Sequence, residues 1–208
     1  MSGAEPKRIS DALLAALPEA ARQSVGERKL ARDQHLFGRG EVPAYMYCVV
    51  SGEVHLQRTS EAGSLLVFQR LREGFVSEAS LFQTTYHCDA VAVAPTIVRS
   101  IPIEIFREGL RQEAFQERWL RHLGQELRRA RTQSERLGLH TVRERIIHYV
   151  ETEGSNGAVR LGFPVKAWAG DLGVAHEVLY RTLKSMKLAG EIATEGSLVR
   201  LLRIRDRT

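Results

Sequence analysis

The hydrophobic positions in the first half of the chain form short runs that alternate with polar residues. Between residues 28 and 100, these runs are separated by turn segments that contain Gly, Pro or Ser. Short runs that repeat about every 8 to 12 residues are typical of an antiparallel β-sandwich or barrel. The predicted strands are residues 34–37, 45–50, 53–58, 65–70, 90–94 and 97–101. Two short amphipathic helices are expected before them, at 9–17 and 19–25, and residues 1–8 are expected to be disordered.

A helical period replaces this pattern after residue 103, first at 103–110 and then in one long helix at 112–137. Apolar or small residues recur along the long helix in alternating steps of three and four, at Leu120, Leu123, Leu127, Ala130, Ser134 and Leu137. Most other positions are charged, Arg136 among them. Such a seam on a polar helix is typical of a coiled coil and predicts a homodimer; the alternative is a seam that packs on its own domain. Phe115 and Trp119 lie off this dimer seam and are expected to pack on the β-domain.

Gly138 interrupts the long helix and is interpreted as a hinge. The elements predicted after it are helices at 142–151, 165–172 and 175–189, a loop at 153–157, and a hairpin made of 192–194 and 198–204. Gly173 joins the last two helices, because glycine permits a bend that a residue with a Cβ resists. The hairpin has the position of a wing, and its arginines, Arg200, Arg203 and Arg205, can contact a DNA backbone.

The last predicted helix has one apolar face and one polar face. The residues expected inside are Val165, Ala169 and Leu172 on the first helix of the pair and Val178, Leu179, Leu183, Met186 and Leu188 on the second. The opposite face carries His176, Glu177, Tyr180, Arg181 and Lys184. A buried stripe opposite a basic, hydrogen-bonding face after a short Gly turn indicates a helix-turn-helix. The alternative is an ordinary pair of surface helices, since apolar periodicity and basic residues are common.

Composition agrees with a DNA-binding protein without demanding one. The chain has 208 residues, enough for one large domain or two modest ones, and its net charge of +5 suits a polyanionic partner. Two cysteines are too few for a disulfide scaffold. Neither a signal peptide nor a membrane-spanning run is visible, so we expect a cytoplasmic protein without membrane contacts. No nucleophile lies beside a plausible base and no carboxylates are paired at catalytic spacing, so we do not expect an enzyme.

The order of a β-roll, a long helix, a glycine and a winged helix-turn-helix resembles the Crp/Fnr family of bacterial transcription regulators. Three segments carry the resemblance: FGRGEVPAYMYCVVSGEVHLQR, REGFVSEASLF and AGDLGVAHEVLYRTLKSMKLAGEI. They are similar to the first half of the family's β-roll, its phosphate-binding cassette and its helix-turn-helix. The resemblance implies an α+β fold with an N-terminal, jelly-roll-like antiparallel β-roll that senses an effector (1–110), a dimerisation helix and hinge (111–138), and a winged helix-turn-helix DNA-binding domain (139–208).

The family's recognition helix commonly reads Ser-Arg-Glu-Thr-Val-x-Arg, and Glu177 and Arg181 match that run, whereas His176 replaces an arginine. An arginine can bind O6 and N7 of guanine, and a glutamate can accept a hydrogen bond from N4 of cytosine. Lys166 and Lys184 are better placed for phosphates, which position a protein on DNA without specifying sequence. A surface ion pair between Glu177 and Arg181 is the plainer interpretation of their spacing.

The sensor site is where the sequence departs from the family. Its cyclic-nucleotide binders use a Glu for the ribose hydroxyl and an Arg-Ser pair for the cyclic phosphate. Glu78 is present, beside Ser77 and Ser80, but the Arg-Ser positions hold Cys88 and Asp89. A half-buried phosphate needs a cation or several N–H donors, so cyclic AMP is not expected as the effector. We still expect an effector pocket around these five residues, with Glu78 as a structural carboxylate.

Metal or haem sensing remains an alternative, but few residues are available as ligands. Family members with an iron–sulfur cluster use several N-terminal cysteines, and residues 1–47 contain none, so no such cluster is expected. On a strand, His87 and Asp89 would point one way and Tyr86 and Cys88 the other, which leaves at most two metal ligands on one face. A metal or haem held by His87 or Cys88 would need help from elsewhere. The simpler interpretation is a buried cysteine and a hydrogen-bonded histidine at a corner of the roll.

These observations predict a homodimeric, sequence-specific transcription regulator of double-stranded DNA. Two recognition helices related by a two-fold axis would enter successive major grooves about 34 Å apart and read a near-palindrome. An effector at the β-roll would change DNA affinity by shifting the packing of the roll on the long helix, with Gly138 as the hinge. The resemblance implies RNA polymerase as a further partner. The alternative function is a ligand-, metal- or haem-binding sensor whose helical tail mainly assembles it.

Overall fold

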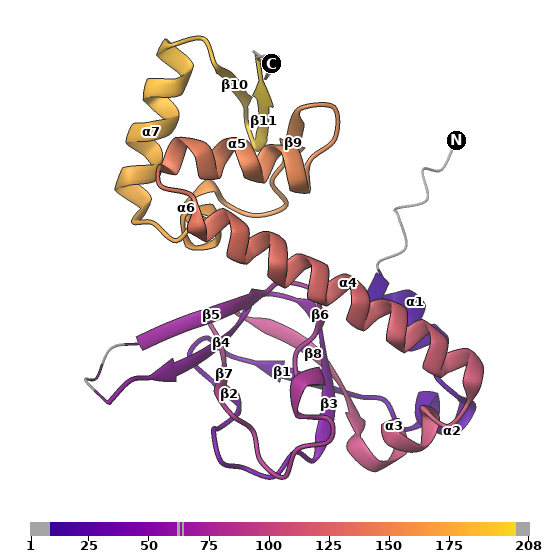
Figure 1. Ribbon diagram of the computed structural model, residues 1–208. Helices are drawn as coiled ribbons and strands as arrows, with labels where there is room; N and C mark the ends of the chain where they lie inside the picture. The colour runs from indigo at the N-terminus through magenta and orange to yellow at the C-terminus, as the bar shows by residue number, and fades with distance from the viewer. Residues whose placement is uncertain (1–8, 62, 64, 203–208) are drawn as a thin grey trace. The chain divides into compact units, whose positions relative to one another are not determined.

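The computed structural model describes residues 9–61, 63 and 65–202 (Figure 1). The chain divides into two compact units, Met1–Leu123 and Gly124–Thr208. The boundary falls inside one continuous helix, α4 (Glu113–Gly138). The expected division at residues 110 and 138 therefore remains a prediction. The expected disorder of residues 1–8, and the wing arginines Arg203 and Arg205, lie outside the described residues.

The N-terminal unit is an antiparallel β-roll built from two four-stranded sheets. One sheet has the strand order β1-β8-β3-β6 and the other β2-β7-β4-β5. The strands are β1 (Gly26–Leu30), β2 (His35–Phe37), β3 (Tyr45–Ser51), β4 (Val54–Thr59), β5 (Leu65–Leu71), β6 (Gly74–Phe75), β7 (Asp89–Ala92) and β8 (Thr96–Pro102). The expected α+β fold with an N-terminal antiparallel β-roll is confirmed.

All six predicted strands are present, and two further strands, β1 and β6, were missed. In β1 only Leu30 is buried, so the segment has no hydrophobic alternation to detect. It forms a strand because it pairs with β8 from Gly26 to Leu30, a contact that local sequence does not reveal. β6 is two residues long and pairs with β3 at Cys48 and Val49.

Helices and aromatic side chains close one end of the roll. These helices are α1 (Ile9–Ala15), α2 (Glu19–Gln23), α3 (Ile103–Gly109) and the first turns of α4. The Trp119 ring meets Phe75 and Phe106 edge-on, with centroid distances of 5.0 and 4.9 Å. Phe115 and Trp119 are both buried in this core, so their expected packing on the β-domain is confirmed.

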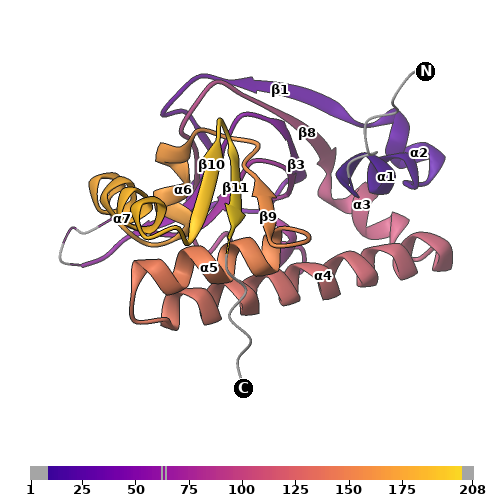
Figure 2. The same cartoon turned by 90° about the horizontal axis from the view of Figure 1, so that it is seen from above.

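The described part of the C-terminal unit contains the second part of α4, three further helices and a small sheet. After α4 come α5 (Val142–Glu153), β9 (Ala158–Arg160), α6 (Val165–Asp171), α7 (His176–Leu188), β10 (Ile192–Glu195) and β11 (Leu198–Leu201). The sheet has the order β10-β11-β9, and Figure 2 shows these strands side by side. The predicted hairpin is thus confirmed, but β9 was missed because only Val159 is buried in its three residues. In the described part of the chain, no helix combines the length and apolar character of a membrane span.

The core of the C-terminal unit forms between α5, α6, α7 and the sheet. The residues predicted to lie inside are buried at Ala169, Leu172, Leu179, Leu183 and Met186, and half-buried at Val165 and Val178. The prediction for Leu188 was wrong, since its side chain is 82% exposed. At about 100° per residue, Leu188 lies almost opposite Met186 on the helix. Sequence reasoning also missed Trp168, which is fully buried in this core.

Candidate functional site

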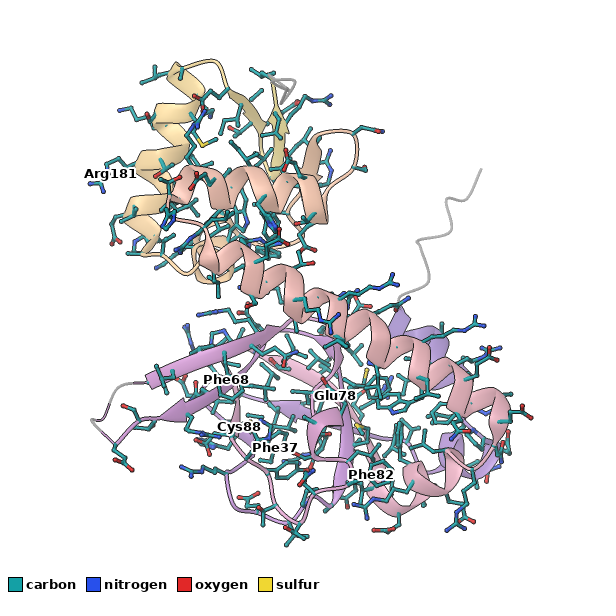
Figure 3. All side chains as sticks on the ribbon, in the orientation of Figure 1. Phe37, Phe68, Glu78, Phe82, Cys88 and Arg181 are labelled. Carbon is teal, nitrogen blue, oxygen red and sulfur yellow. The ribbon has the colours of Figure 1, made fainter. Side chains whose placement is uncertain are left out.

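The polar face of α7 gathers five of the residues predicted to contact DNA. Its members are His176, Glu177, Tyr180, Arg181 and Lys184. Glu177, Tyr180, Arg181 and Lys184 are exposed, and His176 is half-exposed. Figure 3 shows the Arg181 side chain projecting from α7 into solvent. The buried apolar residues of α7 lie on the other face of the helix. The five polar side chains are therefore not used in packing the core of the unit.

Glu177 pairs with its neighbour His176 instead of Arg181. The Nε2 atom of His176 lies 3.0 Å from Oε1 of Glu177. Among the described residues, no ion pair engages Arg181, so the plainer expectation of a Glu177–Arg181 pair is not met. The Arg181 guanidinium therefore keeps its N–H donors for an external acceptor, and His176 orients the glutamate beside it.

The turn before α7 fixes where this face points. Gly173 has a φ of 65°, and its N–H donates to the carbonyl of Gly170 at 3.1 Å. The N–H of Val174 donates to the carbonyl of Ala169 at 2.9 Å. These two bonds form a Schellman motif, in which a glycine with positive φ ends one helix and turns the chain sharply into the next. A Cβ at position 173 would also lie only 2.7 Å from Cδ2 of Leu137.

The small sheet that contains the wing carries further basic side chains. Arg200 on β11 is opposite Ala158 on β9, and Leu198 is opposite Arg160. Alternation along a strand therefore puts Arg160 and Arg200 on the same face of the sheet, and both are exposed. Sequence reasoning named Arg200 but missed Arg160, because it assigned no strand there. Lys166, on α6, is exposed as predicted for a phosphate contact.

The dimer seam of α4 is mostly open to solvent. Leu120, Leu127 and Leu137 are 60%, 53% and 43% exposed, and Ala130 and Ser134 are exposed too. Leu123 is half-buried against the aromatic core of its own unit, and Leu137 lies close to Gly173. The seam thus remains an apolar stripe on a polar helix, with nothing in the described chain covering most of it.

The last turns of α4 are not simply a charged surface. Arg136, one of the charged residues of the long helix, is only 2% exposed. Its guanidinium donates to Gln133 at 2.7 Å and lies 4.5 Å from the ring centroid of Tyr149 on α5. A heptad pattern classifies this position by charge alone and does not detect the burial.

A cavity of about 170 Å³ lies in the N-terminal unit, around the predicted effector residues. Of the five residues predicted for an effector pocket, Ser77, Glu78, Ser80 and Cys88 line this cavity and Asp89 does not. The Asp89 carboxylate instead accepts a hydrogen bond from the backbone N–H of Arg39 at 2.8 Å. Sequence reasoning missed the remaining lining residues, which come from distant strands: Phe37, Leu56, Phe68, Gln69, Val76, Ala79 and His87.

The polar groups near the cavity are largely engaged or neutral. The Ser77 hydroxyl accepts a hydrogen bond from the backbone N–H of Tyr47 at 3.1 Å. Burial raises the pKa of the Cys88 thiol to about 11, and Asp89 adds to this rise. Cys88 is therefore a neutral thiol at neutral pH, which disfavours it as a thiolate ligand or nucleophile. Its neighbour His87 is exposed and faces the ring of Phe68 at a centroid distance of 6.1 Å.

These residues do not fit the phosphate of a cyclic nucleotide. None of the lining residues is an arginine or lysine. The guanidinium of Arg58 donates to the carbonyl of the lining residue His87 at 2.8 Å, but Arg58 does not itself line the cavity. For metals, no group of three or more His, Cys, Asp or Glu side chains in the described ranges is placed to hold an ion. The cavity thus combines apolar walls with several polar groups, none of which belongs to an arginine or lysine.

Comparisons of the sequence place its first domain among known proteins. Residues 27–113 match the family model of the cyclic nucleotide-binding domain. A search of curated protein sequences finds no significant match.

Solved structures share the architecture over most of the chain. A CooA variant from Carboxydothermus hydrogenoformans has a TM-score of 0.66 at 17% identity, covering 90% of this chain and 88% of its own. FixK2 from Bradyrhizobium japonicum has a TM-score of 0.64 at 21% identity, covering 86% and 93%. A CRP-family transcriptional regulator from Thermus thermophilus has a TM-score of 0.58 at 20% identity, covering 85% and 92%. At these identities the likeness concerns the fold.

The resemblance inferred from the sequence is therefore confirmed: residues 27–113 form a domain of the cyclic nucleotide-binding family, and the chain has the fold of the Crp/Fnr transcription regulators.

Proposed function

We propose that this protein is a homodimeric, sequence-specific DNA-binding transcription regulator whose affinity for DNA responds to the β-roll unit. The observation that carries the proposal is the exposed polar face of α7, held in place by the Schellman turn at Gly173 and accompanied by the basic face of the wing. A protein of similar fold from Thermus thermophilus is described as a transcriptional regulator, which agrees with this proposal. Such a regulator acts in the cytoplasm and has RNA polymerase as its natural partner.

The chemistry of the α7 face supports direct reading of base pairs. Arg181 has no ion-pair partner among the described residues and can bind O6 and N7 of a guanine. Glu177, oriented by His176 at 3.0 Å, can accept a hydrogen bond from a cytosine amine. Lys184 and Lys166 supply positive charge for phosphates on either side. The recognition helix would thus read sequence through two residues and use the others for positioning.

The exposed dimer seam supports pairing of two copies. Burying the exposed leucines on α4 against a second copy would remove apolar surface from water, which favours association. A dimer that reads two half-sites needs its two α7 helices about 34 Å apart, one helical turn of DNA. The target would then be a near-palindrome.

Communication between the units requires a pivot, and Gly138 is poorly suited to be one. Gln133, ahead of Gly138, donates through Nε2 to the carbonyl of Asp171 at 2.9 Å. Arg145, after it, donates through Nε to the carbonyl of Leu139 at 3.1 Å. Both flanks of the expected hinge are therefore held within the C-terminal unit.

We infer that the pivot lies at Gly124 instead. The boundary between the two units falls there, inside α4. A Cβ at Gly124 would meet no atom within 4 Å, so packing does not require a glycine at this position. A glycine inside a helix costs roughly 0.5–1 kcal/mol relative to alanine, which makes this turn of α4 easier to open than it would be with an alanine at the same position.

Random-site selection followed by a mobility-shift assay tests the proposed function. We expect a near-palindrome whose half-site centres lie about 10 base pairs apart, bound by two copies of the chain. The affinity should fall as salt rises, because the contacts with phosphates release counterions. If no salt-dependent DNA affinity exists, the proposal fails, and a small-molecule sensor assembled through its helical tail becomes the better account.

A further inference from the structure

The cavity in the β-roll has the size of a single ring. An apolar cavity of about 150 Å³ is large enough to hold one benzene molecule. The cavity in this chain is similar, at about 170 Å³. A cyclic nucleotide carries a base, a ribose and a cyclic phosphate, and so demands more space. Volume alone therefore favours a compact ligand.

The walls of the cavity are mainly apolar. Phe37, Leu56, Phe68 and Val76 supply aromatic and aliphatic surface from four separate parts of the roll. Figure 3 shows Phe37, Phe68 and Cys88 in the same part of the unit, whereas Phe82 lies apart from them. Apolar walls with a few polar groups are typical of small-molecule sites, in which the walls hold the body of the ligand and the polar groups orient it.

The charge distribution disfavours an anion. The carboxylate-bearing residue Glu78 lines the cavity, and no lysine or arginine does. One N–H of the Arg58 guanidinium donates to the carbonyl of His87, and Arg58 is not among the lining residues, although its buried Nε has no hydrogen-bond partner in the described chain. An anion placed here would lose its hydration without gaining a cation, which costs free energy that apolar contacts must offset. The remaining polar residues, such as Gln69 and Ser80, are neutral and suit a hydroxyl or amide.

We propose that this cavity binds a compact, uncharged, mainly apolar molecule of about one ring, and excludes cyclic nucleotides. The inference deepens the effector part of the proposed function, but the binding step itself does not depend on DNA. Phe68 and His87 are both exposed while they line the cavity, so they border its solvent side. A ligand seated behind them would contact β4 and β5 together, and binding would stiffen that part of the roll.

Three probes of different size and charge test the proposal on the full chain. These are benzyl alcohol, benzoate and cyclic AMP, each titrated by ligand-observed NMR without DNA. Benzyl alcohol should bind, benzoate should bind about tenfold or more weakly, and cyclic AMP should not bind. Equal binding of benzoate, any binding of cyclic AMP, or no binding of benzyl alcohol would overturn the proposal.

Two variants locate the site. Phe68→Ala should weaken benzyl alcohol binding several-fold, because it removes one wall of the cavity, while Phe82→Ala, which alters another exposed phenylalanine outside it, should not. The double variant Cys88→Arg with Asp89→Ser supplies the missing cation and should reverse the preference in favour of benzoate. An unchanged preference in that folded variant, or equal effects of Phe68→Ala and Phe82→Ala, would contradict the assigned site. These titrations contain no DNA, so they test ligand binding independently of DNA binding, which the mobility-shift assay measures.

Discussion

The guanidinium of Arg136, near the end of α4, donates a hydrogen bond to the carboxylate of Glu153, the last residue of α5, at 2.6 Å. The same nitrogen donates to the Thr152 hydroxyl at 3.0 Å, and Tyr149 lies under the guanidinium. This buried arginine bridges the two helices across the Gly138 interruption. The end of α4 thereby belongs to the C-terminal unit.

Replacing Arg136 should destabilise the C-terminal unit. Arg136→Met keeps much of the volume but removes every hydrogen bond of the buried guanidinium, and we expect a loss of about 2 kcal/mol or more in the free energy of unfolding. Urea denaturation followed by Trp168 fluorescence, in a Trp119→Phe background, reports on this unit alone. The matched control is Arg129→Met, which breaks an exposed pair with Glu126 at 2.6 Å and should cost at most about 0.5 kcal/mol. Similar losses in the two variants would mean that Arg136 is not a structural bridge.

The pivot can be tested with two glycines of the same helix. Neither Gly124 nor Gly138 would meet an atom within 4 Å if it carried a Cβ. Gly124→Ala should slow amide hydrogen exchange in the neighbouring turns about two- to fivefold, since alanine stabilises a helix interior by roughly 0.5–1 kcal/mol. Gly138→Ala should leave those amides unchanged. If amide hydrogen exchange in the wild-type protein is fastest around Gly138, the result supports the hinge expected from the sequence instead.

The turns before and after α7 each contain a glycine, so the effects of replacing these two glycines can be compared. Gly173 and Gly190 both have positive φ, at 65° and 66°, but only Gly173 has a neighbour that a Cβ would strike. Gly190→Ala should cost about 1–2 kcal/mol for the left-handed backbone, and Gly173→Ala should cost more because of the added clash with Leu137. Thermal denaturation compares them. In a double-mutant cycle, Leu137→Ala should recover part of the Gly173→Ala loss; strict additivity would refute the clash.

The dimer seam predicts a change in oligomeric state. Leu127→Glu places a charge on the seam and should weaken self-association about tenfold or more, as measured by sedimentation equilibrium. Arg128→Glu, one residue along and off the seam, also introduces a glutamate at an exposed position and should have a much smaller effect. Equal effects of the two variants would argue that copies pair through another surface.

The fold was predictable wherever one element carried its own pattern. The stripe of Leu179, Leu183 and Met186 revealed α7 and its exposed face, because helical periodicity is a local property. β1 and β9 were missed because each is short and has one buried residue, so only pairing with β8 or β11 makes it a strand.

The α7 face and the cavity of the β-roll differ in how much of each could be predicted from the sequence. The polar face of α7 lies on one helix, so its exposed residues could be listed from spacing alone, and their contact with DNA remains a prediction. The cavity assembles Phe37, Leu56 and Phe68 from three strands that are separate in sequence, so the sequence indicated only the segment around Glu78. The burial of Arg136 was equally non-local, because it depends on the packing of α4 against α5.

The most direct test of the central claim is base discrimination by Arg181 at the selected DNA site. Fluorescence anisotropy would compare the selected duplex with one in which the guanine contacted in each half-site is replaced, for the unchanged protein, Arg181→Ala and Lys184→Ala. We predict that Arg181→Ala abolishes the difference between the duplexes, worth about 1–3 kcal/mol per guanine, whereas Lys184→Ala weakens both about equally. If Arg181→Ala leaves the discrimination intact, α7 is not the reading helix.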